Sequence, residues 1–395
     1  MNVNEFINTL SADFYTGVPD SLLSVLCDSL IGEYGDDMKH HVIAANEGNA
    51  VALAAGYHLA TGKTGVVYMQ NSGEGNTVNP ICSLLHPDVY GIPCLFVIGW
   101  RGEPGIKDEP QHVFQGKVTF EQMKLLDIET FALNADTTSD ELRSAVEHFH
   151  ELFKKGKSAA IVVSKGALTS EHKFTPEKSQ YSLKREQALE IILKHIPEDT
   201  VIVSTTGKTS RELFELREKQ AVLDGEDINA DLEKKLQCHK HDFLTVGSMG
   251  HASSIALGIA LHKPQSKIIC IDGDGALLMH MGAMATIGNS NIENLIHIAV
   301  NNEAHESVGG FKTAAVKTDY ALIAKACGYK TVLSANSEQE LVGVLEDIKL
   351  KNKENLPVFI EIKCAQGARK ELGRPTVSAK ENKENFMKML NENLS

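Results

Sequence analysis

The chain has 395 residues, of which 42% are hydrophobic and 23% charged, and its formal net charge is −13. This size and composition predict a folded protein of two or three domains. The negative charge disfavours nonspecific binding to nucleic acid or to an anionic membrane, and no apolar run approaches the roughly 20 residues of a membrane-spanning helix. The start of the chain lacks signal-peptide features, and the seven scattered cysteines are explained as reduced core thiols, so a cytoplasmic location is expected.

The first half of the chain alternates apolar runs with segments of helical spacing. Strands are expected at Phe14–Val18, His41–Ala44, Gly65–Met69, Cys94–Gly99 and Ala159–Ser164. Helices are expected at Asp20–Leu30, Glu47–Ala60 and Ser139–Lys155. Continuous apolar strands that alternate with helices indicate a buried parallel sheet. The segment Gly99–Gly116 is predicted to be a long loop at a strand end, where loops are often functional.

The second half repeats this pattern. Strands are expected at Val201–Ser204, Ile268–Ile271, Leu295–Val300 and Val358–Ile362, and helices at Arg185–His195, Ala252–Leu261 and Glu338–Leu350. The sequence therefore predicts an α/β protein with two doubly wound parallel-sheet domains, at residues 1–168 and 184–379, joined by the polar linker 169–183. The segment 218–237 and the polar tail 380–395 are interpreted as solvated helix or mobile surface.

Two polar clusters in the second half follow predicted strands. The first is Gly-Asp-Gly at 273–275, and the second is Asn-Asn at 301–302. In an open α/β sheet such strand ends meet at the edge where ligands bind. A carboxylate and a carboxamide delivered to one edge form an oxygen site of the kind that Mg²⁺ prefers, together with phosphate oxygens.

Two other phosphate-binding patterns fail. The run Gly-Lys-Thr at 207–209 looks like the end of a P-loop, but the glycine required five residues earlier is Ile202. The pattern that starts at Gly273 ends in Leu278 where a dinucleotide fingerprint needs glycine. Nucleotide-binding and NAD-binding functions therefore lose their best support.

Two further signatures accompany the first pair. The segment 45–57 opens a helix directly after a strand, and it places Glu47 in the first turn. The segment Gly-Ser-Met-Gly at 247–250 precedes Asp274, and Met249 taken alone would be a core-filling residue. In this order the signatures resemble thiamine-diphosphate-dependent enzymes. In that family the glutamate bonds the cofactor's aminopyrimidine ring, and the large apolar residue bends the cofactor.

The resemblance covers most of the chain. The first half is similar to the family's pyrimidine-binding domain, and the second half to its diphosphate-binding domain. The chain lacks the middle domain of pyruvate decarboxylase and acetolactate synthase, so it is similar to the two-domain sulfopyruvate and phosphonopyruvate decarboxylases. The segments that most resemble phosphonopyruvate decarboxylases are 17–21, 71–76, 99–105, 108–112 and 204–212.

The resemblance implies a role for particular residues. Thiamine diphosphate would be bound by Asn71, Ser72, Gly73, Gly247, Ser248, Met249, Gly273, Asp274, Gly275 and Asn302. Magnesium would be held by Asp274, Asn302 and the carbonyl of Ala304. The catalytic candidates are Glu47, which activates the cofactor from a partner subunit, and His112 or His305 for proton transfer. An anionic substrate would be read by Ser21, Arg101, Lys208 and Arg211.

The implied reaction is decarboxylation of 3-phosphonopyruvate, a small anionic 2-oxo acid, to phosphonoacetaldehyde and CO₂, as in 2-aminoethylphosphonate biosynthesis. A homo-oligomer with its active site at a subunit interface is implied as well. Three alternatives stay open: a sulfopyruvate decarboxylase, a thiamine-dependent synthase that joins two ketoacids, and a regulatory subunit that binds the cofactor without turnover. The presence of Glu47, Asp274 and Asn302 argues against the last.

Overall fold

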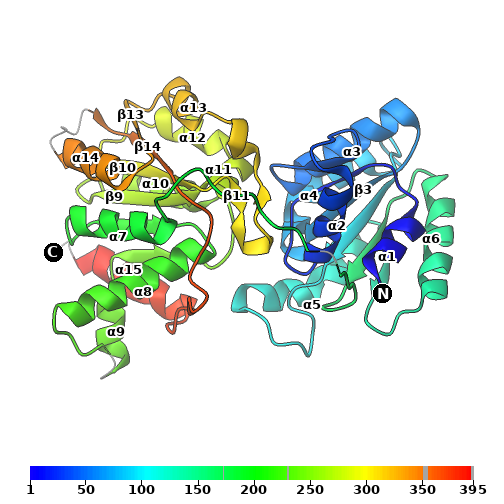
Figure 1. The fold of residues 1–395 in the computed structure, drawn as a ribbon, viewed down its shortest axis with the longest axis horizontal. Helices are drawn as coiled ribbons and strands as arrows, with labels where there is room; N and C mark the ends of the chain where they lie inside the picture. Colours follow the sequence, from blue (N-terminus) through cyan, green and yellow to red (C-terminus); the bar gives the residue numbers. More distant parts are fainter. Residues whose placement is uncertain (172, 229–230, 350–354, 393–395) are drawn as a thin grey trace. The chain divides into compact units, whose positions relative to one another are not determined.

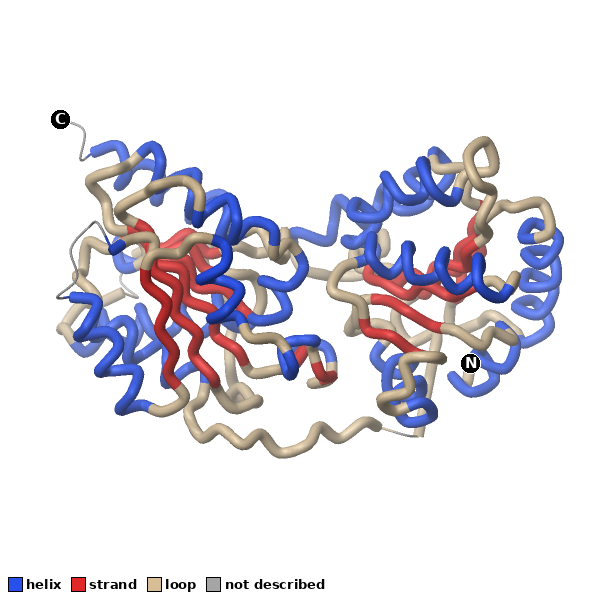
Figure 2. The backbone as a smooth tube through the Cα atoms, turned by 90° about the horizontal axis from the view of Figure 1, so that it is seen from above, coloured by secondary structure: helices blue, strands red, loops and turns tan. Residues whose placement is uncertain are grey.

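A computed structural model describes residues 1–171, 173–228, 231–349 and 355–392. Its contacts divide the chain into two units. The first unit comprises Met1–Pro176 with Val308–Phe311, and the second comprises Glu177–Ser307 with Lys312–Ser395. Each unit is built around a six-stranded parallel sheet with helices on both faces (Figures 1 and 2). This confirms the predicted α/β class with two doubly wound sheets.

The first sheet has the strand order β2-β1-β3-β4-β6-β5. Its strands are β1 (Tyr15–Gly17), β2 (His41–Ile43), β3 (Gly65–Gln70), β4 (Cys94–Gly99), β5 (Glu129–Leu133) and β6 (Ala159–Val163). One face packs against α1 (Val3–Leu10), α2 (Ser24–Tyr34) and α6 (Ser139–Phe153). The other packs against α3 (Glu47–Thr61), η2 (Ile81–Leu85) and α5 (Pro110–Leu125). Between β3 and η2 lie η1 (Asn71–Gly73) and α4 (Glu74–Pro80).

The second sheet has the strand order β13-β14-β10-β9-β7-β8. Its strands are β7 (Val201–Ser204), β8 (Asp242–Leu244), β9 (Ile268–Gly273), β10 (Leu295–Asn301), β13 (Thr331–Ala335) and β14 (Val358–Lys363). One face packs against α7 (Arg185–His195), α8 (Lys208–Leu223) and α14 (Glu338–Lys349). The opposite face packs against α10 (Ala252–His262), α12 (Gly282–Gly288), α13 (Tyr320–Cys327) and α15 (Ala379–Glu392).

The remaining elements of the second half are short. They are α9 (Leu232–Cys238), α11 (Asp274–Met279), β11 (Ala304–His305), η3 (Glu306–Val308), β12 (Phe311–Lys312) and η4 (Ala314–Lys317). Phe311 is fully buried in the core of the first unit. The strands predicted for both halves are confirmed to within two residues at each end, because their runs of apolar side chains are buried on both faces.

The structure corrects several predictions about segments of mixed composition. The predicted loop Gly99–Gly116 is wrong in its second part, because α5 begins at Pro110, a residue that suits the first turn of a helix. The tail from residue 380, interpreted as solvated helix or mobile surface, is the helix α15, and it is packed on the protein, with Phe386 and Met389 buried against the second sheet. In the segment 218–237, α8 continues to Leu223 and α9 begins at Leu232. Residues 172, 229–230, 350 and 393–395, which belong to predicted segments, lie outside the described residues.

The pairing register of the strands places side chains of the predicted site at the carboxyl ends of both sheets. In the first sheet Gln70 lies beside Gly99, so Asn71 and Trp100 leave the sheet together. In the second sheet Val300 lies beside Gly273, so Asp274 and the two asparagines that follow Val300 emerge at the same edge.

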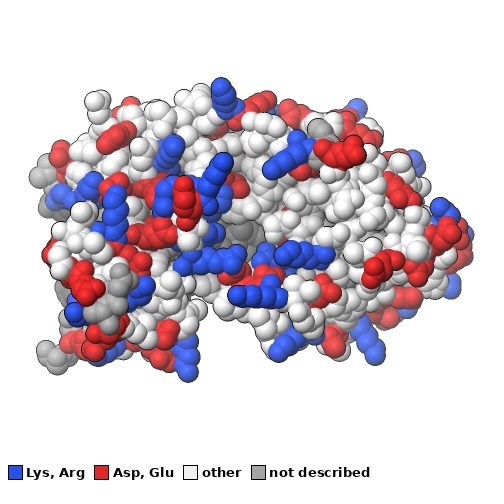
Figure 3. Space-filling model, turned by 60° about the horizontal axis from the view of Figure 1, so that its bottom comes forward, with Lys and Arg blue, Asp and Glu red and all other residues white. Residues whose placement is uncertain are grey.

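None of the described helices is long and apolar enough to cross a membrane. Acidic and basic side chains are interspersed over the face shown in Figure 3.

Candidate active site

Glu47 is a buried carboxylate at the start of α3 in the first unit. The preceding Asn46 caps the helix by accepting a hydrogen bond from the backbone N–H of Asn49, and this fixes the first turn. The side chain of Glu47 is 5% exposed, and its Oε2 accepts a hydrogen bond of 2.7 Å from Asn76 Nδ2. A Cβ atom on Gly73 would lie 2.4 Å from Glu47 Oε1, so only glycine fits there. Burial raises the pKa of Glu47, which suits a group that exchanges a proton near neutral pH.

Arg101 leads the loop that follows β4 in the same unit. Its Nε donates to Asp108 Oδ2 at 2.7 Å, a second guanidinium nitrogen bonds Asp108 Oδ1, and Nη1 donates to Ser21 Oγ at 3.1 Å. Asn71 holds this loop by donating to the Arg101 carbonyl at 2.8 Å. The guanidinium keeps the pKa of Asp108 well below its usual range. The structure thus brings the predicted Arg101 and Ser21 together, and it adds Asp108 as a fixed counter-ion.

Four further polar side chains lie close to this loop. Asp20 is fully buried, accepts a hydrogen bond of 2.5 Å from Gln70 Nε2, and has a pKa raised by burial. Ser72 Oγ donates to Gln70 Oε1 at 2.6 Å, which links the predicted Ser72 to this pair. His112 is 8% exposed, its Nδ1 has no hydrogen-bond partner among the described residues, and burial lowers its pKa. Sequence reasoning missed both Asp20, the first residue of a predicted helix, and Gln70, which directly follows a predicted strand.

Asp274 and Asn302 lie together at the carboxyl edge of the second sheet. Both side chains are buried. Burial raises the pKa of Asp274 to about 6, although several hydrogen bonds, including one from the backbone N–H of Asn302, act in the opposite direction. Thr313 Oγ1 donates to Asp274 Oδ2 at 2.6 Å. Asn302 Oδ1 accepts from the Ala304 backbone N–H at 3.1 Å. Thr313, which the sequence did not point to, orients the carboxylate.

Met249, Gly275 and His305 converge beside this pair. A Cβ on Gly275 would lie 3.3 Å from His305 Cε1, which is a tight contact, and 3.5 Å from Met249 Cε, which is an ordinary van der Waals contact. Ser248 adopts a positive φ of 54°, which turns the backbone between Gly247 and Met249. Burial lowers the pKa of His305 to about 4, so its imidazole is neutral at physiological pH. The segment around 249 therefore presents a large flexible side chain next to the Gly-Asp-Gly turn.

A network of buried charged side chains holds the side chain of Asn302 in place. Glu306 Oε2 accepts from Asn302 Nδ2 and from Arg185 Nη1, each at 2.7 Å, and Glu306 Oε1 accepts from Lys208 Nζ at 3.2 Å. Arg185 in turn makes two 2.7 Å bonds to Glu212. Sequence reasoning missed Arg185, Glu212 and Glu306, because the partners come from distant segments. Lys208 thus lies near Asn302 with a carboxylate already beside it.

Arg211, the last predicted substrate residue, points to the backbone. Its Nε donates to the Gly373 carbonyl at 2.6 Å, and Nη2 donates to the Leu372 carbonyl. Those two contacts tie α8 to the segment that precedes α15. The Nε and Nη2 atoms of Arg211 therefore have a structural role.

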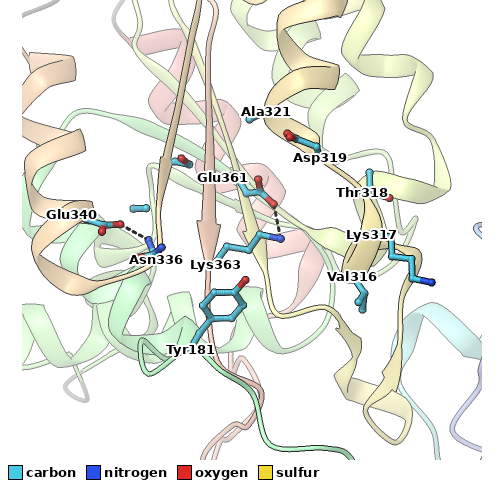
Figure 4. A pocket seen from close by; sticks show the side chains of 12 residues that line it. Tyr181, Val316, Lys317, Thr318, Asp319, Ala321, Asn336, Glu340, Glu361 and Lys363 are labelled. Carbon is cyan, nitrogen blue, oxygen red and sulfur yellow. Dashed lines mark hydrogen bonds and ion pairs between the residues drawn. The ribbon is translucent and has the colours of Figure 1, made fainter.

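A cavity of about 520 Å³ opens at the carboxyl ends of β13 and β14 in the second unit (Figure 4). Tyr181, Lys363 and Glu361 line it, and Lys363 Nζ lies 3.1 Å from Glu361 and 3.3 Å from Glu303. Glu361 also accepts from Asn301 Nδ2 at 2.8 Å. The cavity is therefore connected to the asparagine pair through Glu361, and its buried charges are already paired.

The residues present fit a diphosphate cofactor with a divalent cation. Asp274 offers a buried carboxylate next to the amide of Asn302, and the Asp274 side chain has no cationic partner among the described residues. A hard oxygen pair of this kind suits Mg²⁺. A Cβ atom on Gly273 would meet only Thr205 Cγ2, at 3.9 Å, so the start of the turn leaves room for a ligand. Glu47 in the first unit offers the separate buried carboxylate that an activated aminopyrimidine needs.

Comparison with known proteins identifies the family of the chain. Residues 3–125 match the family model of the thiamine pyrophosphate enzyme N-terminal TPP binding domain, and residues 230–362 match that of the C-terminal TPP binding domain. The chain is 35% identical to the phosphonopyruvate decarboxylase of Streptomyces viridochromogenes, over 92% of this chain and 88% of that protein. It is 34% identical to the phosphonopyruvate decarboxylase of Streptomyces hygroscopicus, over 95% of this chain and 90% of that protein.

A more distant relative is the sulfopyruvate decarboxylase of Methanosarcina acetivorans. It is 25% identical, and the alignment covers 77% of each chain. The two family models describe thiamine pyrophosphate enzymes, and the two Streptomyces relatives are decarboxylases of a 2-oxo acid. The chain therefore belongs to the thiamine-diphosphate-dependent decarboxylases, and it is a carbon–carbon lyase that acts on a 2-oxo acid.

Proposed function

We propose that this enzyme decarboxylates 3-phosphonopyruvate to phosphonoacetaldehyde and CO₂, with Mg²⁺ as the metal, in the biosynthesis of phosphonates such as 2-aminoethylphosphonate. The observation that carries the proposal is the fixed Arg101–Ser21 pair at the carboxyl edge of the first sheet. A planar guanidinium that is held by Asp108 presents its remaining donors in one orientation, which suits a tetrahedral dianion. The similarity to two phosphonopyruvate decarboxylases over most of the chain supports the same substrate.

The residues of the second unit would hold the cofactor's diphosphate. Asp274, Asn302 and the Ala304 carbonyl would ligate Mg²⁺, while backbone N–H groups of the turn at 273–275 would bind the phosphates. Thr313 and Glu306 hold the two ligand side chains in place. The bound cofactor supplies a carbon nucleophile and an electron sink for the pair released with CO₂.

The residues of the first unit would handle the protons. Glu47, supplied by a neighbouring copy of the chain, would share a proton with a ring nitrogen of the cofactor, and burial favours that sharing by raising its pKa. Arg101, with Ser21 and His112 close to its loop, would bind the phosphonate end of the substrate. His305 stays neutral at physiological pH and could accept or donate a proton beside Met249.

A panel of 2-oxo acids tests the substrate directly. We expect CO₂ release from 3-phosphonopyruvate, with added Mg²⁺ and thiamine diphosphate, to exceed release from sulfopyruvate and from pyruvate in kcat/KM. Preference for sulfopyruvate would overturn the substrate assignment but leave the cofactor chemistry standing. Carboligation products in place of free aldehyde would replace the proposed reaction by that of a synthase.

Substitution of Arg101 tests the phosphonate contact. We expect Arg101→Gln to raise KM for 3-phosphonopyruvate by about 10–100-fold, since a charge-assisted hydrogen bond contributes about 1.5–3 kcal/mol, and to change KM for pyruvate little. Arg143→Gln is the matched control, because Arg143 is an exposed arginine of the same unit that pairs with Asp140 on α6. Equal losses for both substrates in Arg101→Gln would show that Arg101 only supports its loop.

A further inference from the structure

The face of the second sheet that packs against α10, α12, α13 and α15 carries a group of metal-ligating side chains outside the active site. Cys270 and Asp272 are two residues apart on β9, so their side chains share a face. His297 lies beside Cys270 in the register of β10. All three residues are 0% exposed. Their candidate ligand atoms, which are the Cys270 sulfur, an Asp272 carboxylate oxygen and a His297 ring nitrogen, lie within 4.8 Å of one another.

Two polar atoms in this group lack partners. Asp272 Oδ2 and His297 Nε2 face each other at 3.6 Å, which is too long for a hydrogen bond, and neither has another partner among the described residues. The second oxygen of Asp272 is occupied, because it accepts from the Gly273 backbone N–H at 3.0 Å. Buried polar atoms are normally paired. Two unpaired ones that point at the same space indicate that a further group fits between them.

The geometry suits a single ion. Three atoms whose separations do not exceed 4.8 Å lie within about 2.8 Å of a common centre, and zinc bonds to nitrogen, oxygen and sulfur are about 2.0–2.3 Å long. Small side-chain rotations would therefore close the site. A sulfur, an imidazole and a carboxylate together favour zinc over Mg²⁺, which prefers oxygen ligands.

Tyr329 completes the arrangement around His297. Its hydroxyl lies 2.9 Å from His297 Nδ1. When Nδ1 carries the ring proton and donates it to that hydroxyl, Nε2 presents its lone pair to Asp272 and Cys270. Metal-binding histidines usually have such a partner on their other nitrogen. The hydrogen bond thus holds His297 in the tautomer that can bind a metal through Nε2.

We propose that Cys270, Asp272 and His297 form a second, structural metal site that binds a zinc ion, separate from the Mg²⁺ site at Asp274. The ion would link β9 to β10 just before these strands deliver Asp274 and Asn302. On binding, the Cys270 thiol releases its proton to solvent and the sulfur becomes a thiolate ligand. The site would therefore stabilise the edge of the sheet on which the cofactor residues stand.

The unmodified full-length protein provides the first test. We expect stoichiometric zinc by elemental analysis after purification and exhaustive dialysis. Replacement of the zinc by cobalt should give a thiolate-to-metal charge-transfer band and the visible bands of tetrahedral cobalt. A protein that holds no zinc and gives no such band with cobalt overturns the proposal, since a buried water molecule would then bridge Asp272 and His297.

Variants locate the metal. We expect zinc to fall to background in Cys270→Ser and His297→Gln, with a lower melting temperature. The control Cys94→Ser removes an equally buried thiol from β4 and should retain zinc. Asp274→Ala should also retain zinc while it loses Mg²⁺-dependent cofactor binding. Zinc that persists in Cys270→Ser, or that disappears in Asp274→Ala, would contradict the proposed site. If a variant does not fold, the cobalt spectrum of the unmodified chain decides whether the site binds a metal.

Discussion

At the scale of single residues, hydrogen bonding distinguishes two buried carboxylates of the first unit. Glu47 is buried but accepts a hydrogen bond from Asn76, whereas Glu74, at the start of α4, is 2% exposed and its Oε1 has no hydrogen-bond partner among the described residues. Burial raises the pKa of Glu74 to about 8. The same physical effect acts on both, yet only Glu47 lies in the family's helix-opening signature.

The role of Glu47 can be tested by an isosteric change. We expect Glu47→Gln to bind thiamine diphosphate and to lose about 10²–10⁴-fold in turnover, because a positioned acid–base group contributes that much. Steady-state kinetics and cofactor titration by calorimetry measure the two quantities. Glu74→Gln is the matched buried control and should keep normal turnover. Near-normal activity of Glu47→Gln would remove its assigned role.

Glu74 should make stability depend on pH. In the folded chain it keeps its proton up to about pH 8, while its ordinary pKa is 4.5. Between these values the unfolded state binds fewer protons than the folded state, so Glu74 lowers the free energy of unfolding by at most ~1.4 kcal/mol per pH unit as pH rises. Above pH 8 the penalty stays constant, and below 4.5 it is absent.

Urea denaturation across this range measures the effect. Glu74→Gln cannot ionise, so we expect the variant to gain stability relative to the unmodified chain as pH rises from 4.5 to 8. Glu121→Gln, on the exposed side of α5, is the control and should run parallel to the unmodified chain. A difference between Glu74→Gln and the unmodified chain that does not change with pH would show that Glu74 is ionised in the folded state.

At the scale of elements, the sequence predicted the central strands and the edge strand β2, and it missed the edge strands β5, β8 and β13. The strands β4, β6 and β9 consist almost entirely of buried residues, and their apolar runs are visible in the sequence. The edge strands β5 and β13 have mixed, partly exposed side chains, so no apolar run marks them. The polar composition of α15 hid the packing of this helix on the sheet, because only a narrow stripe of it is apolar.

The packing of α15 can be tested with two methionines of one helix. Met389 is 8% exposed and belongs to a core cluster of the second unit, whereas Met387 is 51% exposed. We expect Met389→Ala to lower the free energy of unfolding by about 2–5 kcal/mol, and Met387→Ala to change it by less than about 0.5 kcal/mol. Thermal or urea unfolding measures both. Similar small effects would mean that α15 is not packed on the sheet in solution.

At the scale of the whole molecule, the proposed site needs residues of both units. Glu47 stands in the first unit, and Asp274 with Asn302 in the second. The proposed oligomer supplies Glu47 of one copy to Asp274 of another. In a symmetric dimer each pair of copies would then form two equivalent sites.

Mixing two inactive variants tests this arrangement. When Glu47→Gln and Asp274→Ala chains are unfolded and refolded together in equal amounts, a shared site predicts return of about a quarter of the normal activity, since half of the dimers are mixed and each mixed dimer has one intact site. Either variant refolded alone is the control. If the mixture stays inactive although mixed dimers form, both residues act within one chain.

The sequence by itself determined the fold class and the thiamine-diphosphate-dependent family, and it predicted the residues that would bind the cofactor. Those inferences rest on local patterns: apolar strands that alternate with helices, and short signatures whose glycines and acids stand next to one another in the chain. Only the tertiary structure decided which side chains meet across long distances in the sequence. Thr313 on Asp274, Glu306 between Arg185 and Asn302, and the Cys270–Asp272–His297 group depend on how separate strands and helices pack, and no local pattern of residues records that.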